Sequence, residues 1–116
     1  KLKKEQKRIA GGFLNRLKIG MKLQSDPTVI YGINKTVYVK QPLNKKDLLI
    51  DHDWNTYKIS GLPPTPICNV GVSAFDAVLN PEKNNYLYFV ADGKGGHIFS
   101  ETYQEHLNNI KKVYKK

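Results

Sequence analysis

A chain of 116 residues with 40% hydrophobic and 25% charged residues has the composition of one small globular domain. No apolar run approaches the roughly 20 residues of a transmembrane helix, and the first residues lack the pattern of a signal peptide. Cys68 is the only cysteine, which excludes an internal disulfide and a thiolate zinc cluster. Because no initiator Met is present, we expect a piece of a longer polypeptide, with any membrane anchor or export signal outside it.

The net charge of +9 is unevenly distributed along the sequence. The basic residues gather in residues 1–18 and 111–116, and the chain between them is close to neutral. This distribution is more typical of two solvated helix faces than of a nucleic-acid-binding surface. Attraction to a polyanion such as cell wall, phospholipid or nucleic acid is the alternative interpretation.

The first predicted element is a helix over residues 4–18, whose apolar side chains recur on one face. Gly11 and Gly12 interrupt this pattern, and each costs about 1 kcal/mol relative to alanine in a helix. Such a cost suggests close packing of the helix against another backbone. Gly20 is a suitable place for the helix to end.

Three shorter elements are predicted next. Asp26 followed by proline predicts the start of a helix that ends at Gly32, with the Asp26 carboxylate as its cap. Thr36–Val39 is expected to be extended. A short helix is expected over Leu43–Leu49, with Asn44 as its cap.

The second half of the chain predicts a stiff loop, a helix and a hairpin. The three prolines of Gly61–Pro66 make that loop rigid, and Val72–Leu79 predicts a helix. Tyr86–Ala91 is apolar throughout and predicts a strand covered on both faces. Asp92–Gly96 predicts a hairpin turn, and His97–Phe99 the returning strand.

The last predicted helix begins with a capping box formed by Thr102 and Glu105. Its buried face is expected to contain four residues, namely Tyr103, Leu107, Ile110 and Tyr114. The whole pattern predicts an α+β fold with short helices packed around a small antiparallel β-hairpin. No internal repeat or low-complexity segment is apparent.

Most local patterns that could carry chemistry have a simpler structural interpretation. The glycines of Asp92–Gly96 lack the phosphate-loop pattern and lie between two strands, so a turn is favoured. Asp51–Asp53 with His97 or His106 has no natural chelating spacing; we expect His97 to form hydrogen bonds at the hairpin and His106 to lie on a helix surface. No nucleophile motif is present, and no acid pair is singled out among Asp26, Asp51, Asp53, Asp92 and Glu101.

Amide, hydroxyl and aromatic side chains are concentrated in Gln24–Asp26, in Asn55–Tyr57 and beside the proline loop. Such groups on a stiff frame suit sugar recognition, because sugars offer hydroxyls for hydrogen bonds and flat apolar faces for aromatic rings. The same residues are equally compatible with buried polar networks that hold loops in place.

Several long strings in the sequence resemble the conserved patterns of one bacterial enzyme family. Phe13–Leu17 with Gly20–Gly32 resembles the family pattern F-x-N-R-L-x-x-G-M-x-L-Q-[ST]-D-P-T-V-x-Y-G. Asn55–Tyr57 with Gly61–Pro64 resembles N-T-Y…G-L-P-P, and Tyr86–Phe99 resembles Y-L-Y-F-V-A-D-G…G-G-H-x-F. The family is that of the MltG (YceG-like) endolytic murein transglycosylases. The resemblance extends, in order, over almost the whole chain, and it implies that residues 1–116 are the C-terminal part of a larger YceG-like catalytic domain.

The resemblance implies an enzyme that cleaves nascent peptidoglycan strands between N-acetylmuramic acid and N-acetylglucosamine and leaves 1,6-anhydro ends. It implies one N-terminal helix in the bacterial plasma membrane, a catalytic part outside the cytoplasm, and cell-wall synthesis proteins as partners. One carboxyl group can act as acid and then as base. In the family that glutamate belongs to an A-S-[IL]-[IV]-E-K-E stretch. Residues 1–8 contain only Glu5, which does not match, so we expect the catalytic glutamate upstream of Lys1 and no activity from this chain alone.

Carried over by position, the resemblance marks six candidate residues of the substrate cleft: Gln24, Asp26, Thr28, Tyr31, Asn55 and Tyr57. Each can contact glycan or only support the surrounding loops. The chain departs from the family pattern at Gly12, at His52–Trp54, at Thr65 and at Val70, which affects the expected loop geometry. No pattern for a pyridoxal cofactor or for another cofactor is present.

Two alternative functions come from other classes. A non-catalytic module that binds peptidoglycan or cell-wall proteins would use the same polar groups without turnover. Nucleic-acid binding rests on net charge alone, because no nucleic-acid-binding motif is present, so no nucleic-acid partner is expected.

Overall fold

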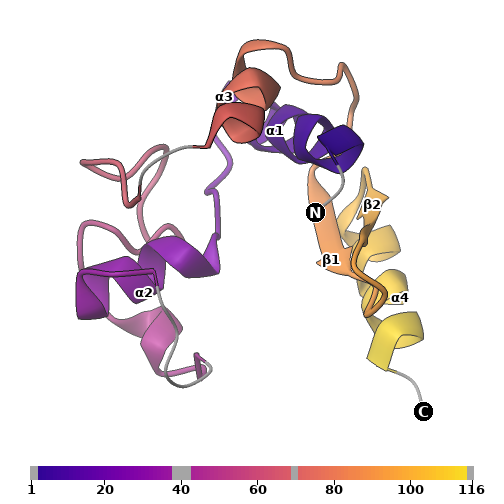
Figure 1. Cartoon of the computed structure of the whole chain (residues 1–116). Coiled ribbons are helices and arrows are strands. Elements are labelled where there is room, and N and C mark those ends of the chain that lie inside the picture. The colour runs from indigo at the N-terminus through magenta and orange to yellow at the C-terminus, as the bar shows by residue number, and fades with distance from the viewer. Residues whose placement is uncertain (1–2, 38–42, 69–70, 115–116) are drawn as a thin grey trace. The chain divides into compact units, whose positions relative to one another are not determined.

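The computed structural model describes residues 3–37, 43–68 and 71–114 (Figure 1). Its elements are, in chain order, α1 (Lys3–Lys18), α2 (Asp26–Asn34), the 3₁₀ helix η1 (Asp47–Leu49), α3 (Val72–Leu79), β1 (Tyr88–Ala91), β2 (His97–Ser100) and α4 (Tyr103–Tyr114). Four α-helices with one two-stranded antiparallel sheet confirm the predicted α+β class. No helix in the described ranges is long and apolar enough to cross a membrane.

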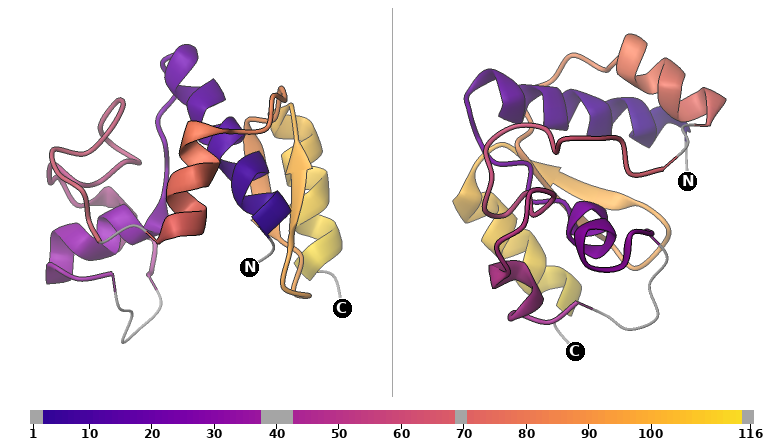
Figure 2. Two further views of the ribbon diagram at one scale, coloured as in Figure 1. Left: turned by 45° about the horizontal axis from the view of Figure 1, so that its top comes forward. Right: turned by 90° about the vertical axis from the view of Figure 1, so that its left-hand side faces the viewer.

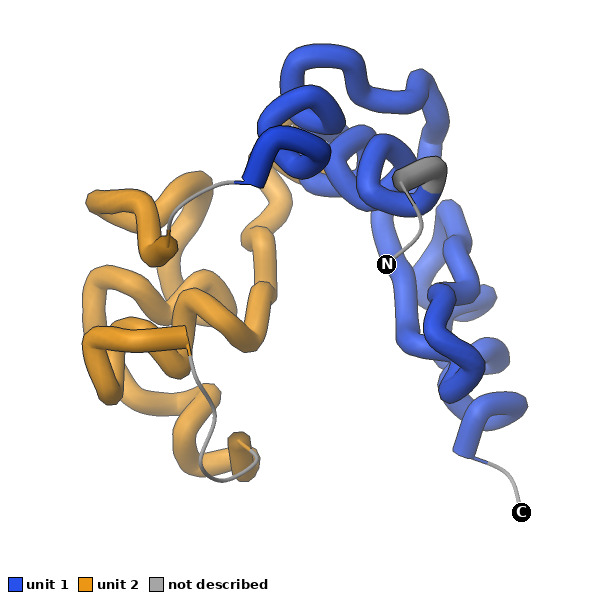
Figure 3. The backbone as a smooth tube through the Cα atoms, viewed as in Figure 1, with its two compact units in different colours: residues 1–15, 70–116 blue, residues 16–69 orange. Residues whose placement is uncertain are grey.

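The chain divides into two compact units (Figure 3). Unit 1 contains residues 1–15 and 70–116, and unit 2 contains residues 16–69. Each unit has its own set of packing and hydrogen-bond contacts, and each is described separately below.

Helix α1 confirms the prediction for residues 4–18 and explains its glycines. Gly11 is buried, and a β-carbon there would overlap the carbonyl oxygen of Glu82. Gly12 is less constrained, since its β-carbon would lie 3.6 Å from the Tyr86 carbonyl oxygen, an ordinary contact. Close packing against another backbone is therefore confirmed at Gly11.

The end of α1 is set by Gly20, as predicted. Gly20 has a left-handed φ of 74°, which glycine adopts without steric cost. Its N–H donates to the Leu17 carbonyl at 3.3 Å, and the Met21 N–H donates to the Arg16 carbonyl at 2.8 Å. These two bonds form a Schellman motif, which satisfies carbonyls of the last helical turn.

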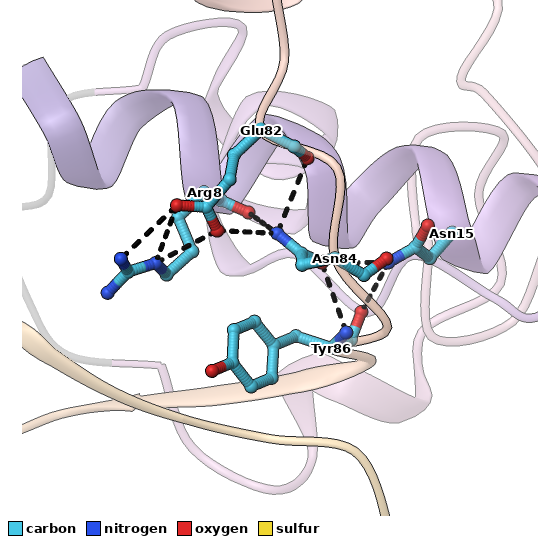
Figure 4. A network of polar contacts seen from close by, with 5 residues as sticks. All are labelled: Arg8, Asn15, Glu82, Asn84 and Tyr86. Atoms are coloured by element: carbon cyan, nitrogen blue, oxygen red, sulfur yellow. Dashed lines mark hydrogen bonds and ion pairs between the residues drawn. The ribbon is translucent and has the colours of Figure 1, made fainter.

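In unit 1, a polar network joins α1 to the segment that precedes β1 (Figure 4). The Arg8 Nε donates to both carboxylate oxygens of Glu82, at 3.0 and 3.2 Å. The Asn15 amide donates to the carbonyl oxygens of Asn84 and Tyr86, at 2.8 and 3.0 Å. The network therefore fixes the path of residues 82–86 along the helix.

The hairpin pairs Tyr88 with Ser100 and Ala91 with His97, and α4 packs against both strands (Figure 2). The capping box is confirmed, because the Thr102 N–H donates to the Glu105 carboxylate at 3.1 Å and the Glu105 N–H to the Thr102 hydroxyl at 3.2 Å.

Three predictions about burial in unit 1 are wrong, namely full coverage of β1, burial of both tyrosines of α4 and a surface position for His106. Strand β1 is half-buried, and its last residue Ala91 is exposed, so the strand is not covered on both faces. On α4, Tyr103 and Tyr114 are exposed, and His106 is half-buried with its ring stacked on Tyr88 at 5.1 Å. His106 therefore lies on the inner face of α4, and the exposed Tyr103 contacts the same Tyr88 ring, with centroids 5.8 Å apart.

Unit 2 has a small core that includes Leu23, Val29 and Ile30. Helix α2 continues past the predicted end at Gly32 and ends at Asn34, with Lys35 in a left-handed conformation. Gly32 has a different purpose: a β-carbon there would overlap the ring of His52. The glycine permits close packing and does not end the helix.

The remaining predictions in unit 2 are corrected or lie partly outside the described residues. Ser25, not Asp26, occupies the position before α2, and its side chain makes no capping bond. The helix predicted over Leu43–Leu49 is reduced to η1 and a preceding turn. The residue before η1 is Lys46, which makes no side-chain cap bond; Asn44 closes the preceding turn, its Oδ1 accepting the Asp47 N–H at 2.9 Å. Residues 36–37 form a bend, and residues 38–39 lie outside the described ranges.

Candidate functional site

Thr56 is the centre of a polar network in unit 2. It is fully buried; its hydroxyl accepts the Ser25 N–H at 2.8 Å, and its carbonyl accepts the Gln24 N–H at 3.1 Å. The hydroxyls of Thr56 and Thr28 lie 2.8 Å apart. One threonine thus joins the start of α2 to the Asn55–Tyr57 turn.

This network holds Gln24 in an unusual backbone conformation. Gln24 has a φ of 50°, a left-handed value that costs a non-glycine residue on the order of 1–2 kcal/mol. Its side chain is exposed. A residue with a strained backbone and an exposed side-chain amide, held by a rigid network, is an outlier from which a functional role can be inferred.

Asn55 supports the same turn from within. It is fully buried, and its amide nitrogen donates to the carbonyls of Leu48 and Ile50, at 3.0 and 2.7 Å. Its amide oxygen accepts the Tyr57 N–H at 3.0 Å. Both amide hydrogens of Asn55 are therefore used within the protein.

Asp26 and Tyr57 form the outer side of the site. The Tyr57 hydroxyl donates to the Asp26 carboxylate at 2.6 Å. Burial of the ring, together with this hydrogen bond, raises the pKa of Tyr57. The phenol therefore keeps its proton at neutral pH and remains a donor to Asp26, whose carboxylate is exposed to solvent.

Tyr31 lies beside Trp54, with ring centroids 5.8 Å apart at 54°. The Trp54 indole N–H donates to the Thr65 hydroxyl at 3.1 Å. Tyr31 is thereby connected to the residue that precedes Asn55 and to the proline loop.

All six residues predicted for the cleft lie in unit 2. Asp26, Asn55 and Tyr57 are joined through the hydrogen bonds described above, and Gln24 and Thr28 are joined to the same turn through Thr56. Gln24 and Asp26 are exposed, Tyr31 and Tyr57 are half-buried, and Thr28 and Asn55 are buried.

Sequence reasoning missed two residues of this region, Thr56 and Trp54. Thr56 was part of a recognised string, but nothing in that string indicates that one hydroxyl joins two segments. Trp54 belongs to the segment that departs from the family pattern. A sole tryptophan next to a polar motif is nevertheless a signal that could have marked it as a candidate site residue.

A second polar cluster lies in unit 1, at the hairpin turn. The Glu5 carboxylate accepts the His97 N–H at 3.1 Å and lies 3.0 Å from His97 Nδ1. These two hydrogen bonds lower the pKa of Glu5. His97 is thus a hydrogen-bonding residue at the hairpin, as predicted.

The turn itself also forms as expected, with left-handed φ values of 79° at Gly93 and 89° at Gly95. The Asp92 carboxylate accepts the N–H groups of Lys94 and Gly96, and these bonds lower the pKa of Asp92.

The chain has an α+β fold, and in unit 2 the exposed side chains of Gln24 and Asp26 lie beside a hydrogen-bonded frame. Its sequence matches the model of the YceG-like family over residues 1–112. The chain therefore belongs to the YceG-like family.

Three proteins of known name or structure are similar to this chain. The chain is 46% identical over 112 residues to an endolytic murein transglycosylase of Bacillus subtilis, covering 97% of this chain and 30% of that protein. It is 34% identical over 110 residues to an endolytic murein transglycosylase of Streptococcus pneumoniae, covering 91% of this chain and 20% of that protein. A crystal structure of a yceG-like protein from Listeria monocytogenes superposes with a TM-score of 0.79 at 47% identity, covering 88% of this chain and 32% of that one.

The chain spans about a third or less of each of these relatives.

Proposed function

We propose that this chain is the C-terminal part of the catalytic domain of an endolytic peptidoglycan lytic transglycosylase. The observation that carries the proposal is the 46% identity to the Bacillus subtilis endolytic murein transglycosylase over 97% of the chain. In this proposal the whole enzyme is held by one N-terminal helix in the plasma membrane, acts outside the cytoplasm on nascent glycan, and works beside cell-wall synthesis proteins.

The proposed reaction cleaves the bond between N-acetylmuramic acid and N-acetylglucosamine. A protonated glutamate, upstream of Lys1 in the longer polypeptide, donates its proton to the leaving oxygen as the C1–O bond breaks. The C6 hydroxyl of the muramic acid then bonds to C1, and the ionised glutamate takes its proton. The products are a 1,6-anhydro end and a free N-acetylglucosamine end, with no water consumed.

The proposed contribution of this chain is to bind and orient the glycan. Gln24, Asp26, Tyr31 and Tyr57 contact the sugar, since their side chains are exposed or half-buried. The Asp26 carboxylate has a second oxygen for a sugar hydroxyl beside the one that accepts the Tyr57 proton. Thr28 and Asn55 support these residues from the buried side.

The first test compares this chain with a longer polypeptide that restores the upstream segment. Purified peptidoglycan is incubated with each, and anhydro-muropeptides are measured by mass spectrometry. We expect products only from the longer polypeptide. Products from the 116 residues alone would show that the acid is within them. A longer polypeptide that binds glycan but never forms anhydro ends would instead be a binding module.

The second test replaces Tyr57 by Phe in the longer polypeptide, and Asp51 by Asn as a control. Asp51 is an exposed carboxylate of the same unit, with a side chain 89% accessible. Loss of one hydrogen bond that orients Asp26 should reduce kcat/KM about tenfold, whereas Asp51→Asn should leave it unchanged. Equal activity of wild type and Tyr57→Phe would remove Tyr57 and its bond to Asp26 from the proposed site.

A further inference from the structure

Trp54 is the only tryptophan of the chain, and polar contacts fix its orientation. Its indole N–H donates to the Thr65 hydroxyl at 3.1 Å, and its backbone N–H donates to His52 Nδ1 at 3.2 Å. The side chain itself is only half-buried. An aromatic ring that is oriented without being fully buried loses little conformational freedom when a ligand binds to it.

The indole already attracts a positively charged group. The Lys35 ammonium lies 4.3 Å from the ring centroid, and Lys35 itself is exposed. At an exposed site such an interaction contributes only about 0.5–1 kcal/mol, so a ligand can displace the lysine. The C–H groups on the apolar face of a sugar carry a small partial positive charge, and the negative face of an aromatic ring attracts them more weakly than it attracts an ammonium group.

Next to the indole, the proline loop lines a small cavity that is open to solvent. It has a volume of about 310 Å³ and is lined by Leu62, Pro63, Pro64, Thr65, Pro66 and Ile67. This volume is at the lower end of the range for ligand sites, and proline holds the loop stiff. Thr65 lines the cavity and also accepts the indole N–H, so one residue connects the cavity to the aromatic ring.

We infer that Trp54 and the loop Leu62–Ile67 form a subsite for one N-acetylated sugar of the glycan. The apolar face of the sugar ring packs on the indole in place of Lys35, and the acetyl methyl group enters the apolar cavity. Thr65 is a positioning residue that holds the indole at the edge of the cavity. The inference rests on the proposed function, because only a glycan substrate brings an acetamido sugar to this surface.

The test uses the whole chain and the fluorescence of its single tryptophan. The probe is a tetrasaccharide of alternating N-acetylglucosamine and N-acetylmuramic acid, and cellotetraose, which lacks acetamido groups, is the matched ligand control. We expect a saturable change of tryptophan emission with the first ligand and at least about fivefold weaker binding of the second. Calorimetry measures the same binding independently of Trp54.

Four variants separate a binding role from a structural one. Trp54→Ala should abolish binding in calorimetry, and Thr65→Val should weaken it severalfold. Thr65→Ser retains the hydroxyl and should bind like wild type. Phe75→Ala is the aromatic control, because Phe75 is exposed on α3 in unit 1. Circular dichroism confirms that each variant is folded.

Two results would overturn the subsite, and they are distinguishable. Binding seen by calorimetry with unchanged tryptophan emission and with full affinity of Trp54→Ala would place the glycan elsewhere, and the proposed function would stand. No binding of the tetrasaccharide by either method would remove both the subsite and the glycan-binding role proposed for this chain.

Discussion

Buried polar side chains fix the geometry of unit 2 at the scale of single residues. Among the described residues, the largest fully buried side chains are Val29, Asn55 and Thr56, and two of these three are polar. Buried polar groups are costly unless they are hydrogen-bonded. Here the Asn55 side chain forms three hydrogen bonds to backbone groups, and the Thr56 hydroxyl is bonded to the Ser25 N–H and the Thr28 hydroxyl. Their bonds specify one conformation of the turn that carries Tyr57.

Replacement of Asn55 by Ala should therefore destabilise unit 2 strongly. The change leaves the carbonyls of Leu48 and Ile50 and the Tyr57 N–H without their partner, at a cost of about 3 kcal/mol. Urea unfolding followed by Trp54 fluorescence measures the effect, because Trp54 is in the same unit. Asn85→Ala, at an exposed position, should change the unfolding free energy by less than about 0.5 kcal/mol. Similar stabilities of the two variants would contradict a supporting role for Asn55.

The Glu5–His97 contact makes the stability of unit 1 depend on pH. The native pKa of Glu5 lies below its ordinary value of 4.5, so the unfolded state binds a proton more readily. The contribution of the carboxylate is fully present above pH 4.5 and is lost as the pH falls through the lower native pKa.

Comparison of wild type with Glu5→Gln isolates this contribution. Asp92, which titrates over a similar range and also has a lowered pKa, is present in both proteins and cancels. The difference in unfolding free energy, measured from about pH 6 to about pH 3, should favour wild type at the upper end and shrink toward the lower end. A difference that is constant over this range would exclude the ionised carboxylate as its source.

At the scale of elements, close backbone approach and helix caps decide where each helix begins, ends and packs. The Schellman motif at Gly20 and the capping box at Thr102 are local devices, and both form as the sequence indicates. Gly11 is different, because it is needed for contact with residue Glu82, which is distant in sequence. Such close packing limits which residues a helix can contain at that position, whatever their intrinsic helix propensity.

Gly11 and Gly12 are neighbours in α1 with opposite expected responses to alanine. Alanine is favoured over glycine in a helix by about 1 kcal/mol. At Gly11 the added methyl group overlaps a backbone oxygen that cannot move freely, so we expect a net loss of about 1–3 kcal/mol. At Gly12, where the contact is ordinary at 3.6 Å, the variant should be neutral or more stable. Thermal unfolding monitored by circular dichroism compares them, and equal melting temperatures would contradict the close packing at Gly11.

Across the whole molecule, local sequence rules predicted which helices and strands form better than they predicted which side chains those elements bury. The α+β class, α1, α3, the hairpin and both ends of the capping box follow from periodicity, glycine placement and side-chain caps. The end of α2 and the inner face of α4 could not be predicted, because they depend on His52 packing on Gly32 and on Tyr88 stacking with His106. Such contacts join segments whose proximity no local pattern reveals.

The candidate site shows the same division. The sequence strings predicted Gln24, Asp26 and Tyr57 for one site, but the Thr56 hydroxyl that joins their segments depends on contacts between residues distant in sequence. Which side chains are exposed and which are buried within the strings is likewise a property of the folded unit. The proposed division between residues that contact glycan and residues that support them therefore rests on the burial seen in the structure.

The packing of His52 on Gly32 also constrains how this sequence can change over generations. A side chain larger than hydrogen at position 32 meets the imidazole directly, and the imidazole is itself tied to the backbone of Trp54. We therefore expect a larger residue at position 32 to cost less stability where position 52 carries a smaller side chain. The residues at positions 32 and 52 should therefore change together, in an order set by the space between the helix backbone and the side chain at position 52.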